Sequence, residues 1–229
     1  MALHKIKAIL FDVGGTLIYT IKPLLKAISM AFEQNKIKVA SSEEIIAQLG
    51  KSATEIITAI LPKELSNFEE LAKECISSFQ EIFPNKVLDE FKAIDGVQKT
   101  LKMLKDANYR LGVITALRKA ELDKLLAKFD LNPYFEVFVT TDDVQSIRPS
   151  PEIVNLAMSL LNVQPKEVVC VGDTVNDILA AKSAGTYVIA VLTGAQTQEV
   201  LKREQPDAII KDITILPSVL EKLTYSYEI

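Results

Sequence analysis

Short apolar runs that alternate with helix-like segments constrain the fold of this 229-residue chain more than any other feature. The runs are rich in Val and Ile, which is typical of strands that are covered on both faces of a parallel sheet. Regular alternation of strands and helices predicts an α/β protein with a parallel sheet. We expect strands at residues 6–11, 111–115, 136–140, 168–171, 187–191 and 208–210, and helices between them at 96–107, 118–129, 151–161 and 174–184.

The segment from residue 20 to residue 94 does not follow this alternation. It lacks clear strand signals and shows successive helical patterns, and Ser41 with Glu44 has the spacing of a capping box. We expect helices at 22–34, 42–49, 53–61 and 65–83. The sequence therefore predicts two units: a core made of residues 1–19 and 95–229, and an all-helical insert of residues 20–94.

A lone carboxylate follows the first predicted strand. Asp12 stands at the strand end, and Gly14 and Gly15 follow it closely. Open α/β sheets place their chemistry at the carboxyl ends of strands. Asp12 is therefore the first candidate for a catalytic residue.

Two further carboxylates follow the strand at 168–171. Asp173 and Asp177 lie about one helical turn apart, a spacing that allows both to face one hard divalent ion. The simpler interpretation is that Asp173 or Thr174 caps the next helix, as such residues commonly do. Capping accounts for one of the two aspartates and not for both.

Thr115 and Arg148 are weaker candidates when each is considered separately. Thr115 ends a predicted strand, where its hydroxyl could donate to a phosphate oxygen or serve only as a β-prone residue. Arg148 stands before Pro149, and its planar fork suits carboxylate and phosphate oxygens. A solvated surface arginine is the alternative.

Taken in order, these four segments resemble the motifs of the haloacid dehalogenase-like (HAD) hydrolases, of the phosphatase type with an inserted helical cap. The resemblance covers nearly the whole chain and implies a Rossmann-like parallel sheet core with an all-helical cap domain. It implies that Asp12 attacks phosphorus and forms an aspartyl-phosphate. It also implies that Thr115 and Arg148 hold the transferring group as catalytic and substrate-binding residues.

The same resemblance implies a magnesium site. Asp12, the backbone carbonyl of Gly14 and Asp173 would bind Mg²⁺, with Asp177 supporting the site from behind. A carbonyl ligand needs no side chain, so glycine at position 14 is compatible with it.

The chain departs from the family pattern at two positions. Arg148 stands where a lysine is usual, and Gly14 stands where phosphatases carry a second Asp that acts as acid and base. General acid–base groups contribute roughly 100- to 10,000-fold in rate, or roughly 3 to 5 kcal/mol in barrier. The protein could recruit another group, use water, act on a substrate with a good leaving group, or be a weak enzyme.

A lysine in the insert is a candidate substrate contact. Residues 48–51 resemble the turn that family members place over the substrate, so Lys51 could bind a substrate anion. A plain surface lysine is about as consistent with the sequence. Relatives that cleave carbon–phosphorus bonds also lack the second Asp and use a cap lysine, and Lys51 is the candidate for that role.

Composition excludes several other functions. The net charge of −4 and a pI near 5.3 argue against a general nucleic-acid binder. We find no signal peptide and no apolar run long enough for a membrane, and Cys75 and Cys170 form no disulfide or zinc pattern. We therefore expect a cytoplasmic protein with no nucleic-acid or membrane partner.

The sequence thus favours a magnesium-dependent phosphatase of a small phosphorylated metabolite, since a closing cap excludes a folded protein substrate. A phosphonate- or halide-cleaving enzyme and a non-catalytic phosphate-binding protein are the alternatives. Neither the substrate nor the oligomeric state follows from the sequence.

Overall fold

The computed structural model describes residues 6–64 and 67–225. Within these residues the core is a six-stranded parallel sheet with the strand order β5-β4-β1-β6-β7-β8. The strands are β1 (Ala8–Phe11), β4 (Arg110–Ile114), β5 (Val137–Val139), β6 (Val168–Gly172), β7 (Tyr187–Val191) and β8 (Ala208–Ile210). The predicted α/β class is confirmed, and each predicted strand is present with bounds shifted by at most two residues.

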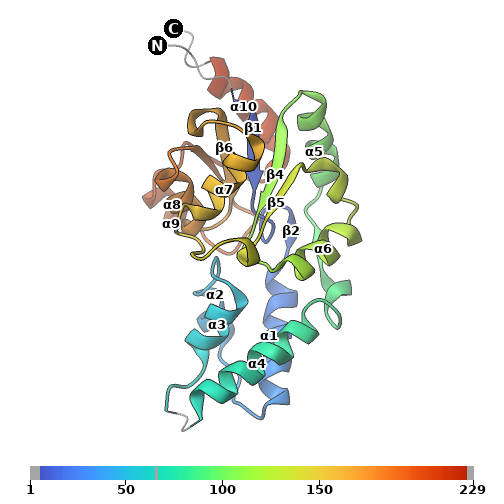
Figure 1. Ribbon diagram of the computed structural model, residues 1–229, viewed down its shortest axis with the longest axis vertical. Coiled ribbons are helices and arrows are strands. Elements are labelled where there is room, and N and C mark those ends of the chain that lie inside the picture. Colours follow the sequence, from blue (N-terminus) through green and yellow to red (C-terminus); the bar gives the residue numbers. More distant parts are fainter. Residues whose placement is uncertain (1–5, 65–66, 226–229) are drawn as a thin grey trace.

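Alternate residues of each strand face opposite layers of helices, as the pleat of a strand requires. Ile9 and Phe11 belong to one apolar cluster, which α5 (Val97–Asp106), α6 (Lys119–Lys128) and α10 (Leu216–Tyr225) help to build. Ala8 and Leu10 belong to the other, with α7 (Glu152–Leu161), α8 (Val175–Ser183) and α9 (Gln198–Arg203). Figure 1 shows the sheet between these two layers. We did not predict α9 and α10 from the sequence.

A block of four helices lies beyond one end of the sheet (Figure 1). It consists of α1 (Ile21–Gln34), α2 (Ser42–Ile46), α3 (Ala53–Ile60) and α4 (Phe68–Ile82), with α1 packed along α4. The expected capping box of Ser41 and Glu44 begins α2, and a second box that we did not predict, Ser52 with Glu55, begins α3. Residues 65 and 66, the first two of the predicted helix 65–83, lie outside the described residues, as do residues 1–5 of the predicted core.

Two very short strands join the helical block to the core. β2 (Ile18–Tyr19) and β3 (Lys92–Ala93) pair antiparallel, so the chain leaves and re-enters the core side by side. Two residues are too few to show an alternating pattern, and for that reason we did not predict these strands. We expected the chain to cross between the units near these residues.

Short 3₁₀ turns complete the fold at Leu88–Glu90, Asn132–Tyr134, Thr141–Asp143, Pro165–Glu167 and Ile213–Ile215. In the described part of the chain, no helix has both the length and the apolar character that a membrane crossing needs.

Candidate active site

The carboxyl ends of the central strands meet the helical block at a cavity of about 100 Å³. Core loops form one wall, and Leu24, Ala53 and Phe79 of the helical block form the other. The structure brings all seven sequence-predicted site residues to this cavity: Asp12, Gly14, Lys51, Thr115, Arg148, Asp173 and Asp177. Parallel strands make this convergence possible, since their carboxyl ends share one edge of the sheet.

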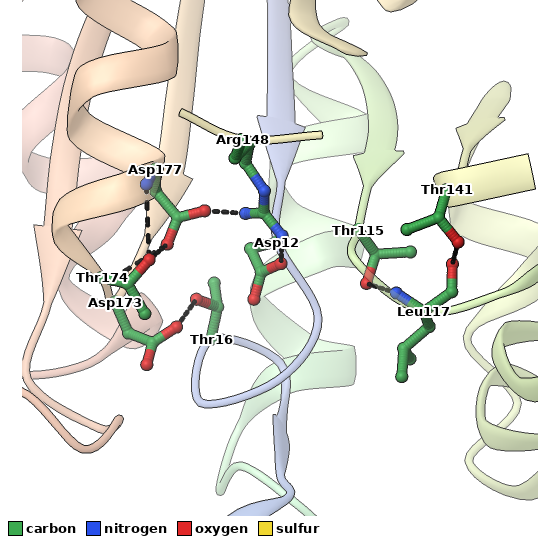
Figure 2. A network of polar contacts seen from close by, with 9 residues as sticks. All are labelled: Asp12, Thr16, Thr115, Leu117, Thr141, Arg148, Asp173, Thr174 and Asp177. Carbon is green, nitrogen blue, oxygen red and sulfur yellow. Dashed lines mark hydrogen bonds and ion pairs between the residues drawn. The ribbon is translucent and has the colours of Figure 1, made fainter. Parts of the chain in front are cut away.

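Asp12 follows β1 and is held by a buried cation. Arg148 Nη2 donates to Asp12 Oδ1 over 2.7 Å, and both side chains are less than a tenth exposed (Figure 2). Burial raises the pKa of the Asp12 carboxyl, while the Arg148 charge and the backbone N–H groups of Val13 and Gly14 act against that rise. A carboxylate in this position has little water around it, as a nucleophile in a closed site requires.

Arg148 also pairs with a second aspartate. Its Nη1 contacts Asp177 Oδ1, while Asp177 Oδ2 accepts hydrogen bonds from the backbone N–H (2.9 Å) and the hydroxyl (2.6 Å) of Thr174. Thr174 is the N-cap of α8, so Asp177 closes the capping box of that helix. A Cβ at Gly172 would overlap the Asp177 carboxyl, so this close packing needs a glycine there. Both oxygens of Asp177 are therefore engaged, and one of them orients Arg148.

Asp173 lies on the side of Asp12 away from Arg148 (Figure 2). Its surroundings disfavour a negative charge on its carboxyl group. Burial, followed by the negative charge of Asp12, raises the pKa of Asp173 to about 8. The Thr16 hydroxyl donates to Asp173 Oδ1 over 3.4 Å (Figure 2). A Cβ at Gly15 or at Gly194 would overlap the Asp173 carboxyl, so two glycines let the backbone approach it.

This charge arrangement fits a divalent cation. Asp12 and Asp173 raise each other's energy, and a hard cation between their oxygens would remove that repulsion. The Gly14 backbone lines the same cavity and can add a carbonyl oxygen. Among the described residues no three His, Cys, Asp or Glu side chains form a ready metal cluster. A metal here would consequently rely on two carboxylates, backbone oxygen and water, as Mg²⁺ often does.

Thr115 and Lys51 approach the cavity from opposite sides. Thr115 is buried after β4, and its Oγ1 accepts from the backbone N–H of Leu117 over 3.3 Å (Figure 2). A hydroxyl that accepts one bond keeps its proton for another acceptor. Lys51 is exposed, and its Nζ donates to Gln48 Oε1 over 2.7 Å. The loop that carries it also reaches the core, because a Cβ at Gly50 would lie 2.9 Å from Thr174 Oγ1.

Sequence reasoning missed three residues at the site: Thr16, Thr20 and Glu121. It offered Thr174 as a possible helix cap, and Thr174 is indeed the N-cap of α8, with Asp177 completing the capping box. Thr20 Oγ1 would lie 2.8 Å from a Cβ at Gly14, so it occupies part of the space that a side chain at position 14 would need. Only the tertiary structure shows that Glu121 is buried at this cavity.

The parallel sheet, the helical insert after β1 and the carboxylates at neighbouring strand ends define a capped α/β hydrolytic enzyme. The family described as haloacid dehalogenase-like hydrolase matches residues 9–191 of the sequence. The chain therefore belongs to the haloacid dehalogenase-like hydrolases, and the predicted family membership is confirmed.

Relatives and solved structures agree with this membership. The chain is 31% identical to pyrophosphatase PpaX of Bacillus pumilus over 94% of its length and 96% of the relative. It superposes with a TM-score of 0.87 on a crystal structure from Haemophilus somnus described as a predicted phosphoglycolate phosphatase, at 24% identity and with 95% and 99% of the two chains covered. A structure of CbbY from Rhodobacter sphaeroides with phosphate gives 0.75 at 24% identity over 92% and 96%. At these identities the two structures establish the fold.

Proposed function

We propose that this protein is a magnesium-dependent phosphatase of a small phosphorylated metabolite and that it acts through an aspartyl-phosphate. The observation that carries the proposal is the position of Asp12, a buried carboxylate at the cavity floor with Arg148 on one side and Asp173 on the other. Family membership supports hydrolysis, and the position of Asp12 supports its role as the nucleophile.

In this proposal each residue has one task. An Asp12 oxygen forms a bond to phosphorus as the bond to the leaving oxygen breaks. Arg148 keeps Asp12 ionised and fixed, because its planar group is held between Asp12 and Asp177. The Thr115 hydroxyl donates to an oxygen of the transferring group. Such fixed donors favour the charge that develops in the transition state.

The proposed metal ligands are Asp12, Asp173 and the carbonyl of Gly14. When bound, Mg²⁺ would neutralise charge on the phosphoryl oxygens. Asp177 supports the site by orienting Arg148, since both of its oxygens already have partners.

The size of the cavity supports a small substrate. Its volume of about 100 Å³ is below the range of about 300 to 1,000 Å³ that is usual for drug-sized ligands. We propose that residues 20–94 act as a cap over it and that Lys51 contacts a substrate anion. A second candidate substrate is inorganic pyrophosphate, because relatives at 31% identity bear the name pyrophosphatase. We also propose that the protein works in the cytoplasm.

Cleavage of a carbon–phosphorus or carbon–halogen bond, or phosphate binding without catalysis, are the alternatives. A Schiff-base route would need Lys51 as the amine, and borohydride trapping with a carbonyl phosphonate tests for the adduct. Halide release without metal would favour the dehalogenase route.

The test of the proposed function is a screen of phosphate monoesters and pyrophosphate with Mg²⁺ and with EDTA, using Asp12→Asn as the inactive control. Phosphate release that requires both Mg²⁺ and Asp12 is the expected result. Full release in EDTA would remove the magnesium assignment, and equal release by Asp12→Asn would remove the nucleophile.

A further inference from the structure

Gly14 leaves the proposed reaction without a carboxylate at the usual position, yet the cavity has another one. Glu121 lies in the first turn of α6, the helix that follows β4 and Thr115 in the sequence. It lines the same cavity as Asp12 and is only 3% exposed. It belongs neither to the Asp12–Arg148–Asp177 network nor to the proposed metal ligands.

The position and hydrogen bonds of Glu121 suit a general acid. Ala53 and Phe79 of the helical block line the cavity with it, so the carboxyl lies where the core meets the helices. Its Oε2 accepts from the Arg118 backbone N–H over 3.0 Å and its Oε1 from Arg118 Nε over 3.3 Å. These bonds fix the side chain without removing it from the cavity lining.

The charges around Glu121 come from two elements of the core. Burial raises the pKa of the Glu121 carboxyl, the Arg118 charge lowers it, and Asp142 of the turn after β5 raises it again. The helical block adds the uncharged Ala53, Phe79 and Gln80 to this lining. A carboxyl whose pKa is raised by burial is a better general acid than an exposed one.

We propose that Glu121 is the acid and base of the reaction in place of the missing carboxylate at Gly14. As Asp12 bonds to phosphorus, the bond to the leaving oxygen breaks, and that oxygen takes the electron pair and the Glu121 proton. In the second step water attacks the aspartyl-phosphate and gives its proton to Glu121, which frees Asp12 and phosphate and restores the acid. This inference rests on the proposed phosphatase function.

Other groups at the cavity suit this task less well. Thr20 lies closest to the space that a side chain at Gly14 would fill, but an aliphatic hydroxyl is far too weak an acid to protonate a leaving group. Asp177 pairs with Arg148, the cation that holds Asp12, and Asp173 faces Asp12 on the side of the proposed metal. Lys51 is exposed and bonded to Gln48.

The experiment compares esters that need protonation with esters that do not. An alkyl phosphate loses a basic alkoxide, whereas nitrophenyl phosphate loses a stable phenolate. In the first turnover, Glu121→Gln should slow release of the alcohol from the alkyl phosphate by about 100-fold or more and leave release of nitrophenolate within about threefold. Its steady-state kcat should fall for both esters, because both share the second step. Glutamine preserves the capping box, so α6 should remain intact. Glu44→Gln, the same change in the exposed box of α2, is the matched control and should alter neither rate.

Two further readouts separate catalysis from structure. The fall in alkyl phosphate turnover at high pH, where the acid is deprotonated, should disappear in Glu121→Gln. Gly14→Asp placed in the Glu121→Gln background should restore first-turnover release of the alcohol at least tenfold while changing first-turnover release of nitrophenolate little.

The outcomes are distinguishable. An unchanged first-turnover release of the alcohol in Glu121→Gln, or an equal first-turnover loss for both esters, would overturn the role of Glu121 and leave the phosphatase proposal intact. A wild-type protein that is inactive on both esters and on pyrophosphate would overturn the phosphatase function, and this inference with it.

Discussion

Arg148 Nη2 donates to Asp12 Oδ1 over 2.7 Å in an ion pair that is almost completely buried. The pair joins a loop before α7 to the end of β1, two segments that are 136 residues apart in the sequence. Arg148 reaches Asp177 with its other terminal nitrogen, so one guanidinium pairs with two carboxylates. A lysine has one ammonium and lacks this planar fork. The geometry therefore gives a reason for arginine at this position.

Replacing Arg148 should show how much the pair stabilises the fold. Arg148→Met leaves Asp12 and Asp177 buried without their cation and should lower the free energy of unfolding by about 3 to 5 kcal/mol. Arg148→Lys should cost less, because it keeps one of the two pairings. Urea unfolding of both variants measures the difference. Lys102→Met, which breaks the exposed pair with Asp106, is the control and should change little. Equal stability of all three variants would contradict the bridging role.

Magnesium should stabilise the protein through Asp173. A ligand that binds only the folded state raises the free energy of unfolding by about 2.7 kcal/mol at 100 times its dissociation constant. The wild-type thermal midpoint should therefore rise with added Mg²⁺, and the midpoint of Asp173→Asn should not. Thermal unfolding with Mg²⁺ and with EDTA measures this without any substrate. A wild-type thermal midpoint that does not change with added Mg²⁺ would count against the proposed magnesium site.

The sequence indicated the strands because their apolar character depends only on local residues. Tyr187–Val191 and Ala208–Ile210 have the predicted bounds. The pairing of β2 with β3 could not be predicted, because two residues are too few to show a periodic pattern. The paired residues are also about 74 positions apart in the sequence. Spacing likewise could not show that Arg148 meets Asp177, or that Glu121 is buried at the cavity. Each of these depends on how distant segments pack.

Both cysteines should be inert in the folded protein. Burial raises the pKa of the Cys75 thiol to about 11 and that of the Cys170 thiol to about 12. Reaction requires the thiolate, so neither should react with a thiol reagent at pH 8, whereas the unfolded chain should expose two thiols. Counting reactive thiols with and without urea checks this. The native thiols should remain unlabelled toward pH 10 as well, because both side chains are buried away from the reagent. Rapid native labelling of either cysteine would contradict the burial.

The adjacent glycines after Asp12 should respond differently to a side chain. Gly14 has no left-handed backbone angle, and an added Cβ would meet only the Thr20 side chain, with Thr20 Oγ1 at 2.8 Å. Gly15 has φ of +78°, and its Cβ would overlap the Asp173 carboxyl. Gly14→Asp should therefore fold normally, whereas Gly15→Ala should lose about 1 kcal/mol or more and weaken Mg²⁺ binding. Unfolding curves and Mg²⁺ titrations of the two variants measure this. Equal damage in both would mean that position 14 is as constrained as position 15.

The cap loop offers the clearest test of closure over the site. Gly50 has φ of +91° and lies against Thr174 of the core, so Gly50→Val should keep the loop from seating. If the cap closes on substrate, this variant should raise KM for a phosphate ester several-fold while the core remains folded.

Lys51→Met should also raise KM, because it removes a cation from the cavity lining. It should leave stability unchanged, because the side chain is exposed. Lys63→Met is the control, since Lys63 is an exposed lysine of the helical block that does not line the active-site cavity. Steady-state kinetics of the three variants distinguish the interpretations. A higher KM in Gly50→Val alone supports closure without a Lys51 contact. Equal KM values for Lys51→Met and Lys63→Met would mean that Lys51 is only a surface residue.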